Sequence, residues 1–186
     1  MESLQRDSFN DIVKFALIAF IIVVPIRIFI AQPFIVRGAS MDPTFQNGQY
    51  LIVDQLSYRF EAPKRGDVII MRYPKDPSVF FIKRIIGLPG ETVEIQGKQV
   101  VIQQGVGKSP ITLDESFIDP SRIRDEYASY TVGPDEYFVM GDNRKESSDS
   151  RSWGLLPRKD IMGKTFLRLF PLSAIALSPG HVSFPQ

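Results

Sequence analysis

The sequence contains no cysteine and only one histidine among its 186 residues. A chain without cysteine forms no disulfide and offers neither a thiolate metal ligand nor a thiol nucleophile. The single histidine, His181, lies in the C-terminal stretch HVSFPQ, where a lone imidazole is usually a surface residue. We therefore expect neither a Ser-His-Asp triad nor a histidine-rich zinc site.

The sequence also has no excess of charge of either sign. It contains 22 Lys and Arg residues and 21 Asp and Glu residues, which gives a formal net charge of +1. This balance gives no reason to expect a nucleic-acid groove. The stretch GVGKS (residues 105–109) lacks the first glycine of a phosphate-binding loop at the required spacing, and Pro110 would block the helix that should follow. Neither a nucleic acid nor a nucleotide is expected as a partner.

Long apolar runs are missing except near the N-terminus. FALIAFIIVVPI (residues 15–26) carries no charge, and IFIA resumes the apolar character after Arg27. About 20 apolar residues cross ~30 Å of hydrocarbon as a helix. We therefore expect residues 1–11 to form a short tail, residues 12–31 a retained transmembrane anchor, and residues 32–186 one globular domain.

A cleaved signal peptide and a buried core helix are the alternatives to an anchor. A signal peptide would need a positive leading region and small residues before the cut. Here Glu2, Asp7 and Asp11 offset Arg6 and Lys14. Because basic residues flank the segment on both sides, the charges do not decide its orientation.

Beyond residue 31 the apolar residues come in short runs bounded by Gly, Pro, Asn and Asp, which is typical of strands. We predict a mainly β fold with an antiparallel sheet, a hairpin around Gly97, and one weak helix at residues 119–128. Loop-rich sequence indicates a small subdomain or excursion at residues 97–134. The predicted strands are residues 33–36, 49–54, 67–73, 79–86, 91–96, 98–103, 137–140 and 161–170.

A small hydroxyl, Ser40, stands in RGASMDPTF (residues 37–45) without an obvious activating partner. In the absence of histidine and cysteine, a serine nucleophile needs a lysine, a carboxylate or a metal. Lys83 is embedded in the apolar stretch VFFIKRIIG, and burial there would favour its neutral form. From these residues alone, an edge-strand lysine that deters aggregation is the favoured interpretation.

Four segments, in order, resemble the successive sequence boxes of type I signal peptidases. They are GASMDPTF (38–45), RGDVIIMRYP (65–74), FIKRIIGLPGE (81–91) and GDNRKESSDSRSWG (141–154). With the N-terminal apolar segment, the resemblance spans the chain from about residue 15 to residue 163. It implies a largely β serine endopeptidase with a Ser-Lys dyad, which removes signal peptides from exported pre-proteins at the membrane surface and uses no cofactor or metal.

By this resemblance Ser40 is the nucleophile and Lys83 the general base. The Ser40 backbone N–H is expected to stabilise the oxyanion of the tetrahedral intermediate. Some family members supply a second donor from a serine hydroxyl two positions earlier, but this chain has Gly38 there. We therefore expect a backbone N–H or a water in the region of Gly38 to take that role.

The resemblance also assigns residues around the base. Ser147 matches the serine whose hydroxyl holds the lysine amine in place. Asp149 and Arg151 match an ion pair near the base, and Arg84 is expected in the same network. The turn of residues 141–144 would position this part of the site.

Signal peptidases prefer small residues, typically Ala, at the first and third positions before the cut. By match to the family, shallow pockets that exclude larger side chains would be lined by Phe34, Val36, Phe81 and Ile82. An extended substrate would pair with the strand leading to Ser40 and with the strand holding Lys83.

We expect a monomer whose partners are the signal peptides of pre-proteins and a lipid bilayer. A single span suits a plasma membrane with the catalytic domain on the extracytoplasmic side, and suits a thylakoid membrane equally. One rival is a self-cleaving regulator of the related Ser-Lys class, but such proteins cut an Ala-Gly bond, which this chain lacks. The other rival is a catalytically inactive, membrane-anchored β module that binds export partners.

Overall fold

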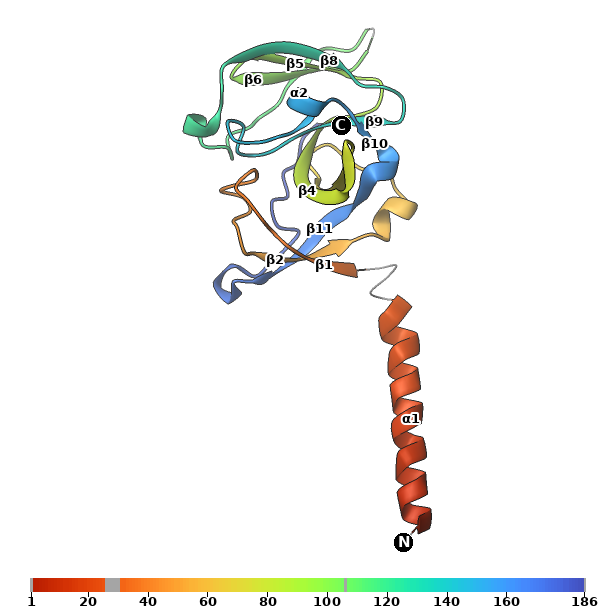
Figure 1. Cartoon of the computed structure of the whole chain (residues 1–186). Helices are drawn as coiled ribbons and strands as arrows, with labels where there is room; N and C mark the ends of the chain where they lie inside the picture. Colours follow the sequence, from red (N-terminus) through yellow and green to blue (C-terminus); the bar gives the residue numbers. More distant parts are fainter. Residues whose placement is uncertain (1, 26–30, 106, 186) are drawn as a thin grey trace.

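A computed structural model describes residues 2–25, 31–105 and 107–185. Helix α1 (Glu2–Pro25) projects from a β-rich domain that contains the remaining elements, as Figure 1 shows. Among the described residues, no helix combines the length and the apolar character needed to cross a membrane. Residues 26–30 of the predicted anchor lie outside the described residues.

The main sheet is antiparallel and carries the segments that the resemblance assigns to catalysis. Its strands run in the order β1-β2-β11-β3-β4-β9-β10, and β12 pairs with β11. Short 3-10 turns connect some of the strands: η2 (Ser57–Arg59), η4 (Arg158–Asp160) and η5 (Leu172–Ala174). The strands are β1 (Ala31–Ile35), β2 (Tyr50–Asp54), β3 (Val68–Tyr73), β4 (Asp76–Gly87), β9 (Glu136–Met140), β10 (Leu156–Pro157), β11 (Ile161–Phe170) and β12 (Ala176–Leu177).

A second, four-stranded sheet forms the upper part of the domain in Figure 1, in the order β7-β6-β5-β8. The predicted hairpin around Gly97 is confirmed, since β5 and β6 pair on either side of it and its φ is +66°. This sheet is formed by β5 (Thr92–Gly97), β6 (Gln99–Gln103), β7 (Ile111–Thr112) and β8 (Glu126–Thr131).

The predicted helix at residues 119–128 is wrong. The chain makes one short turn, η3 (Pro120–Arg122), and then enters strand β8. Residues of β8 alternate between half-buried and exposed, and the strand pairs along its length with β5. Pairing with a neighbouring strand therefore outweighs the weak local helical preference.

Strand β4 is longer than predicted and connects the two parts of the domain. It pairs with β3 on one side and β9 on the other, with Lys83 opposite Ile69 and Arg84 opposite Met140. Its first five residues are exposed, and the stretch from Ile82 to Gly87 is buried. The lysine predicted as the base thus lies in the interior of the sheet, at the boundary between two hydrophobic clusters.

Candidate active site

The segment after β1, which contains Ser40, is held in place by buried side chains and by hydrogen bonds from Asn143. Met41 and Phe45 are buried in the hydrophobic cluster under β1 to β4. Across the segment, the Asn143 backbone N–H donates to the Ser40 carbonyl at 3.0 Å, and Asn143 Nδ2 donates to the Ala39 carbonyl at 3.1 Å. Hydrophobic burial and these two hydrogen bonds fix the direction in which the Ser40 hydroxyl points.

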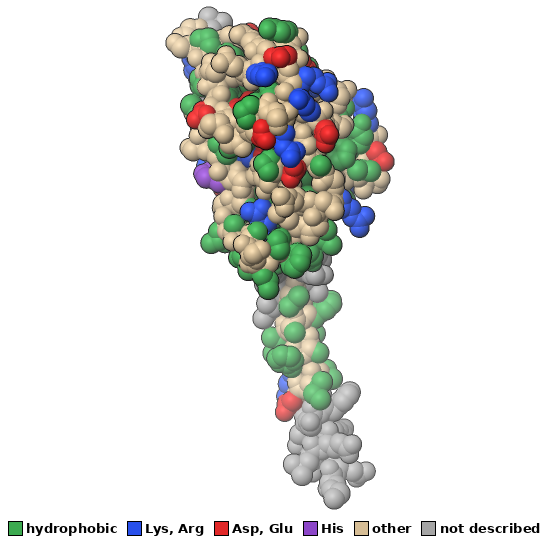
Figure 2. Space-filling model, turned by 90° about the vertical axis from the view of Figure 1, so that its left-hand side faces the viewer, with side chains coloured by type: hydrophobic (Ala, Val, Ile, Leu, Met, Phe, Trp, Pro, Cys, Tyr) green, Lys and Arg blue, Asp and Glu red, His purple; other side chains and the backbone are tan. Residues whose placement is uncertain are grey.

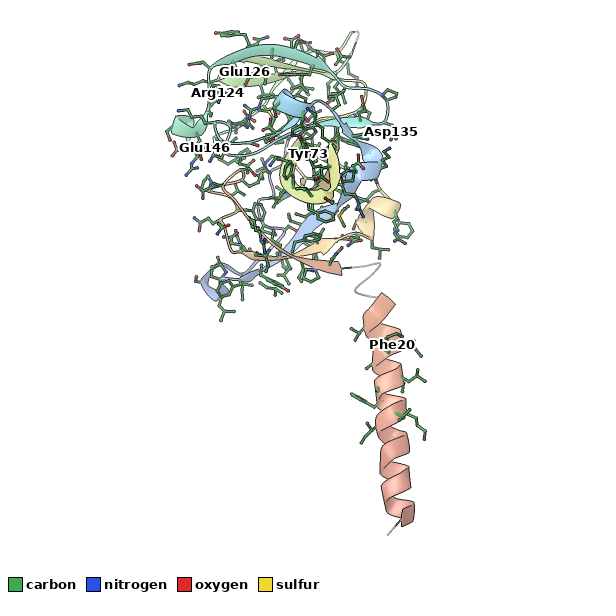
Figure 3. The ribbon with its side chains drawn as sticks, in the orientation of Figure 1. Phe20, Tyr73, Arg124, Glu126, Asp135 and Glu146 are labelled. Atoms are coloured by element: carbon green, nitrogen blue, oxygen red, sulfur yellow. The ribbon has the colours of Figure 1, made fainter. Side chains whose placement is uncertain are left out.

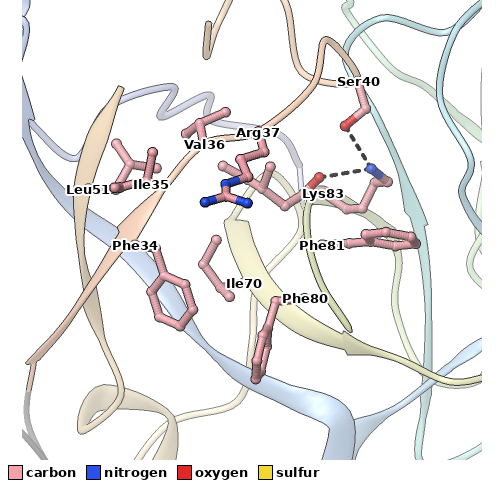
Figure 4. Close-up of a pocket in the computed structure, with 11 residues that line it drawn as sticks. Phe34, Ile35, Val36, Arg37, Ser40, Leu51, Ile70, Phe80, Phe81 and Lys83 are labelled. Carbon is pink, nitrogen blue, oxygen red and sulfur yellow. Dashed lines mark hydrogen bonds between the residues drawn. The ribbon is translucent and has the colours of Figure 1, made fainter. Parts of the chain in front are cut away.

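The Ser40 hydroxyl lies against the amine of Lys83, as Figure 4 shows. Lys83 Nζ donates to Ser40 Oγ at 2.8 Å and to the Ile82 carbonyl at 3.0 Å. The amine also lies 5.1 Å from the centre of the Phe81 ring. No carboxylate forms an ion pair with Lys83 among the residues that the structure describes.

Burial lowers the pKa of Lys83 from 10.5 to about 8, because the charged amine loses its hydration. The negative charges of Asp149 and Asp142 oppose this shift, and the positive charge of Arg151 adds to it. At neutral pH about a tenth of such lysines are neutral, against a few in ten thousand for a free lysine. The neutral amine, which is the form that a general base requires, is therefore populated at neutral pH.

A groove of about 340 Å³ opens beside the Ser40–Lys83 pair. Phe34, Val36, Phe81 and Ile82, which the resemblance places in the substrate pocket, all line it. The sequence reasoning missed the other side chains of the lining, which arrive from both edges of the groove (Figure 4). They are Ile35, Arg37, Leu51, Ile70 and Phe80.

Gly141, at the end of β9, allows the two serine segments to approach each other. A Cβ at this position would clash with the Ser40 carbonyl oxygen on one side and with Ser147 Oγ on the other. Ser147 Oγ is buried and has no hydrogen-bond partner of good geometry within the described residues. Its predicted contact with Lys83 is not formed in this structure, so its orienting role stays a prediction.

Asp149 and Arg151 form the ion pair that the resemblance implies. The Arg151 guanidinium donates to Asp149 from Nε and from Nη2, each at 2.8 Å, and the Gly141 N–H donates to Asp149 Oδ2 at 3.0 Å. Burial alone would raise the pKa of Asp149, but the hydrogen bonds and charge of Arg151 hold it below the ordinary value. Arg151 also contacts Glu126 at 3.4 Å, which connects the site to the small sheet, where Figure 3 labels Glu126.

Arg84 belongs to a different network from the one expected. Its guanidinium forms two hydrogen bonds with Asp142, from Nε at 2.9 Å and from Nη2 at 2.7 Å. Its Nη1 donates to the carbonyls of Gly66 and Gly180. Asp142 in turn accepts a hydrogen bond from Thr44, in the Ser40 segment, at 2.6 Å. This buried pair therefore holds the Ser40 segment against the turn of residues 141–144.

The backbone around the predicted oxyanion site is partly engaged. The Ser40 N–H makes no hydrogen bond to another described residue, which leaves it available to a ligand. The Gly38 N–H donates to Asn47 Oδ1 at 3.0 Å and is therefore occupied. Gly38 has φ of +88°, a conformation that a serine adopts only with strain. The identity of a second oxyanion donor stays a prediction.

Comparisons with known proteins agree on one family. A sequence model for signal peptidase, peptidase S26, matches residues 9–170. A probable signal peptidase I-2 from Synechocystis sp. is 35% identical over 181 residues, which cover 95% of this chain and 80% of the relative. A signal peptidase I P from Bacillus subtilis subsp. natto is 34% identical over 184 residues, which cover 94% of this chain and 96% of the relative.

A solved structure was also matched, a signal peptidase I from Enterococcus faecalis at 30% identity. The match covers 56% of this chain and 97% of that one, with a TM-score of 0.45. The family match alone extends over most of the chain, and the relatives extend over nearly all of it. This chain therefore belongs to the signal peptidase family of serine peptidases, peptidase S26.

Proposed function

We propose that this chain is a membrane-anchored endopeptidase that cuts signal peptides after an Ala-X-Ala sequence, with Ser40 as nucleophile and Lys83 as general base. The observation that carries the proposal is the 2.8 Å contact between Lys83 Nζ and Ser40 Oγ at the edge of an apolar groove. A hydroxyl and a base within hydrogen-bond reach are the minimum for nucleophilic catalysis by serine. No other lysine of the described residues lines this groove.

The reaction begins when neutral Lys83 accepts the Ser40 proton as Ser40 Oγ attacks the scissile carbonyl carbon. The carbonyl oxygen becomes an oxyanion, to which the Ser40 N–H donates. The carbon–nitrogen bond then breaks, and the Lys83 ammonium gives its proton to the leaving amine. Lys83, neutral again, takes a proton from a water as the water oxygen attacks the acyl carbon. The bond from this carbon to Ser40 Oγ then breaks, Oγ regains a proton from Lys83, and the signal peptide leaves with a new carboxylate.

Selection for small residues follows from the groove beside the dyad. Aromatic and branched side chains form its walls, with Phe34 and Phe80 in edge-to-face contact at 5.8 Å. We propose that these walls accept a methyl group and exclude larger side chains. Phe34, Val36, Phe81 and Ile82 are therefore proposed to accept the first and third residues before the cut.

The proposed anchor is residues 12–31, which would hold the site beside the bilayer. Only nine residues separate the end of this segment from Ser40, a span of at most ~30 Å when extended. Figure 2 shows apolar side chains on the described part of α1 and on the end of the β domain that faces it. Flotation with liposomes should recover the whole chain and lose most of it when residues 1–31 are removed.

Cleavage of a pre-protein by wild type, Ser40→Ala and Lys83→Ala tests the dyad. Both variants should lose at least a thousandfold in kcat, because neither half of a nucleophile–base pair works alone. Lys164→Ala, which removes a half-buried lysine outside the groove that pairs with Glu61, serves as the control and should cleave like wild type. Undiminished cleavage by both dyad variants would refute the assignment, and absence of cleavage by wild type would favour the inactive β module.

A further inference from the structure

Arg37 is a cation without a partner at the rim of the groove. It lies three positions before Ser40 and lines the groove with its side chain exposed. Five other arginines of the domain are paired with carboxylates, whereas no described residue forms an ion pair or a side-chain hydrogen bond with Arg37. In Figure 4 its guanidinium lies among the groove side chains and is joined to none of them by a dashed line.

The backbone around Arg37 continues an edge strand. β1 is the outermost strand of the main sheet, and within the described chain no strand pairs with its other edge. The Val36 N–H donates to the Gln49 carbonyl and the Val36 carbonyl accepts from the Gly48 N–H, both at 2.9 Å. Because N–H and C=O directions alternate along a strand, those of Ile35 and Arg37 point to the free edge. An extended peptide can add to the sheet there.

Side-chain alternation then determines which substrate residue meets Arg37. Val36 is buried toward the core, whereas the side chains of Ile35 and Arg37, which also line the groove, are exposed at its rim. A peptide strand beside them alternates in the same way. If the first and third residues before the cut enter the groove, the second residue lies on the face of Arg37.

We propose that Arg37 selects substrates by the charge of the second residue before the cut, favouring a carboxylate and disfavouring a cation at that position. This inference rests on the proposed function, since it needs a peptide bound for cleavage at Ser40. The guanidinium attracts Asp or Glu and repels Lys or Arg across the same short distance. Both partners stay near solvent, so each effect should be about two- to fivefold in kcat/KM at low salt and smaller at high salt.

The test uses three peptides of one sequence that carry Ala-Glu-Ala, Ala-Gln-Ala or Ala-Lys-Ala before the cut. Wild type should cleave the Glu peptide fastest and the Lys peptide slowest, mainly through KM. Arg37→Gln should cleave all three at similar rates, and Arg37→Glu should prefer the Lys peptide. The ratio between two peptides within one enzyme does not depend on how much of a variant is folded.

A matched control separates local contact from a change in net charge. Lys108→Glu alters the charge equally at an exposed position in the loop between β6 and β7, outside the groove, and should keep the wild-type preference. Equal cleavage of the Glu and Lys peptides by wild type at low salt would overturn the role of Arg37. Failure of wild type to cleave any of the peptides would instead count against the proposed function.

Discussion

Lys83 and Arg84 are adjacent on β4, and their side chains lie on opposite faces of the strand, where their charges have different partners. Both side chains are almost fully buried. Lys83 lies among apolar side chains with one hydroxyl and one carbonyl as partners, and burial lowers its pKa to about 8. Arg84 has a carboxylate and two carbonyls around its guanidinium. On one face the buried lysine has no carboxylate partner, which favours the neutral amine that a general base needs. On the other face a carboxylate pairs with the buried arginine and stabilises the fold.

The largest expected contrast is in stability. Arg84→Met should lower the free energy of unfolding by about 3 to 5 kcal/mol, because it leaves Asp142 buried and unpaired. Lys83→Met should leave it unchanged or raise it by up to about 3 kcal/mol at pH 7, because a buried lysine with a pKa near 8 opposes folding. Urea unfolding followed by the fluorescence of Trp153 measures both. Equal destabilisation by the two variants would show that the two faces of β4 do not differ in how they compensate a buried charge.

A second prediction concerns Gly141, which lies between the Ser40 carbonyl and the Ser147 side chain. Gly141→Ala should lower kcat by about a hundredfold, because the added methyl pushes Ser40 and Ser147 apart and small displacements of reacting groups are costly. The matched control is Gly87→Ala, whose Cβ would meet Val93 and Phe138 between the two sheets. The control should lose stability and keep most of its kcat in cleavage assays. Full activity of Gly141→Ala would refute the close approach.

A third prediction concerns the pH dependence that Lys83 imposes. Below pH 8, kcat/KM should fall about tenfold per pH unit, because Lys83 must be neutral to accept the Ser40 proton. The free energy of unfolding should rise from pH 8 to 10.5, since unfolded Lys83 still holds the proton that folded Lys83 has released. A kcat/KM profile that is flat from pH 6 to 9 would contradict a titrating base.

Several strands could be predicted from local sequence. All eight predicted strands occur, because alternating or continuous apolar runs between turn residues report local burial. Strand β8 was missed, since its half-buried residues carry a weak pattern and its conformation depends on pairing with β5. The apolar neighbours of Lys83 in FFIKRII indicate burial, but from these residues alone an edge-strand lysine is the favoured interpretation. That interpretation is wrong, because β4 lies between β3 and β9 and Lys83 is buried.

The partners of the charged residues could not be predicted in the same way. We expected Arg84 in the network of Asp149. The register of β4 against β9 instead places its guanidinium against Asp142, on the face of β4 opposite to Lys83. The approach of Ser147 and Ser40 over Gly141 also depends on where strand ends meet. Such contacts join residues about 60 to 100 positions apart, and no local pattern encodes them.

The sequence by itself determined that a serine and a lysine with apolar neighbours are available and that histidine, thiol and zinc chemistry of the usual kinds are not expected. It did so because composition and apolar runs are local properties of the chain. Only the tertiary structure decided that Lys83 Nζ lies 2.8 Å from Ser40 Oγ while its neighbour Arg84 is paired. It also decided that Arg37 lines the groove beside a free strand edge. These outcomes depend on strand order and register, which bring distant segments together and set the face each side chain occupies.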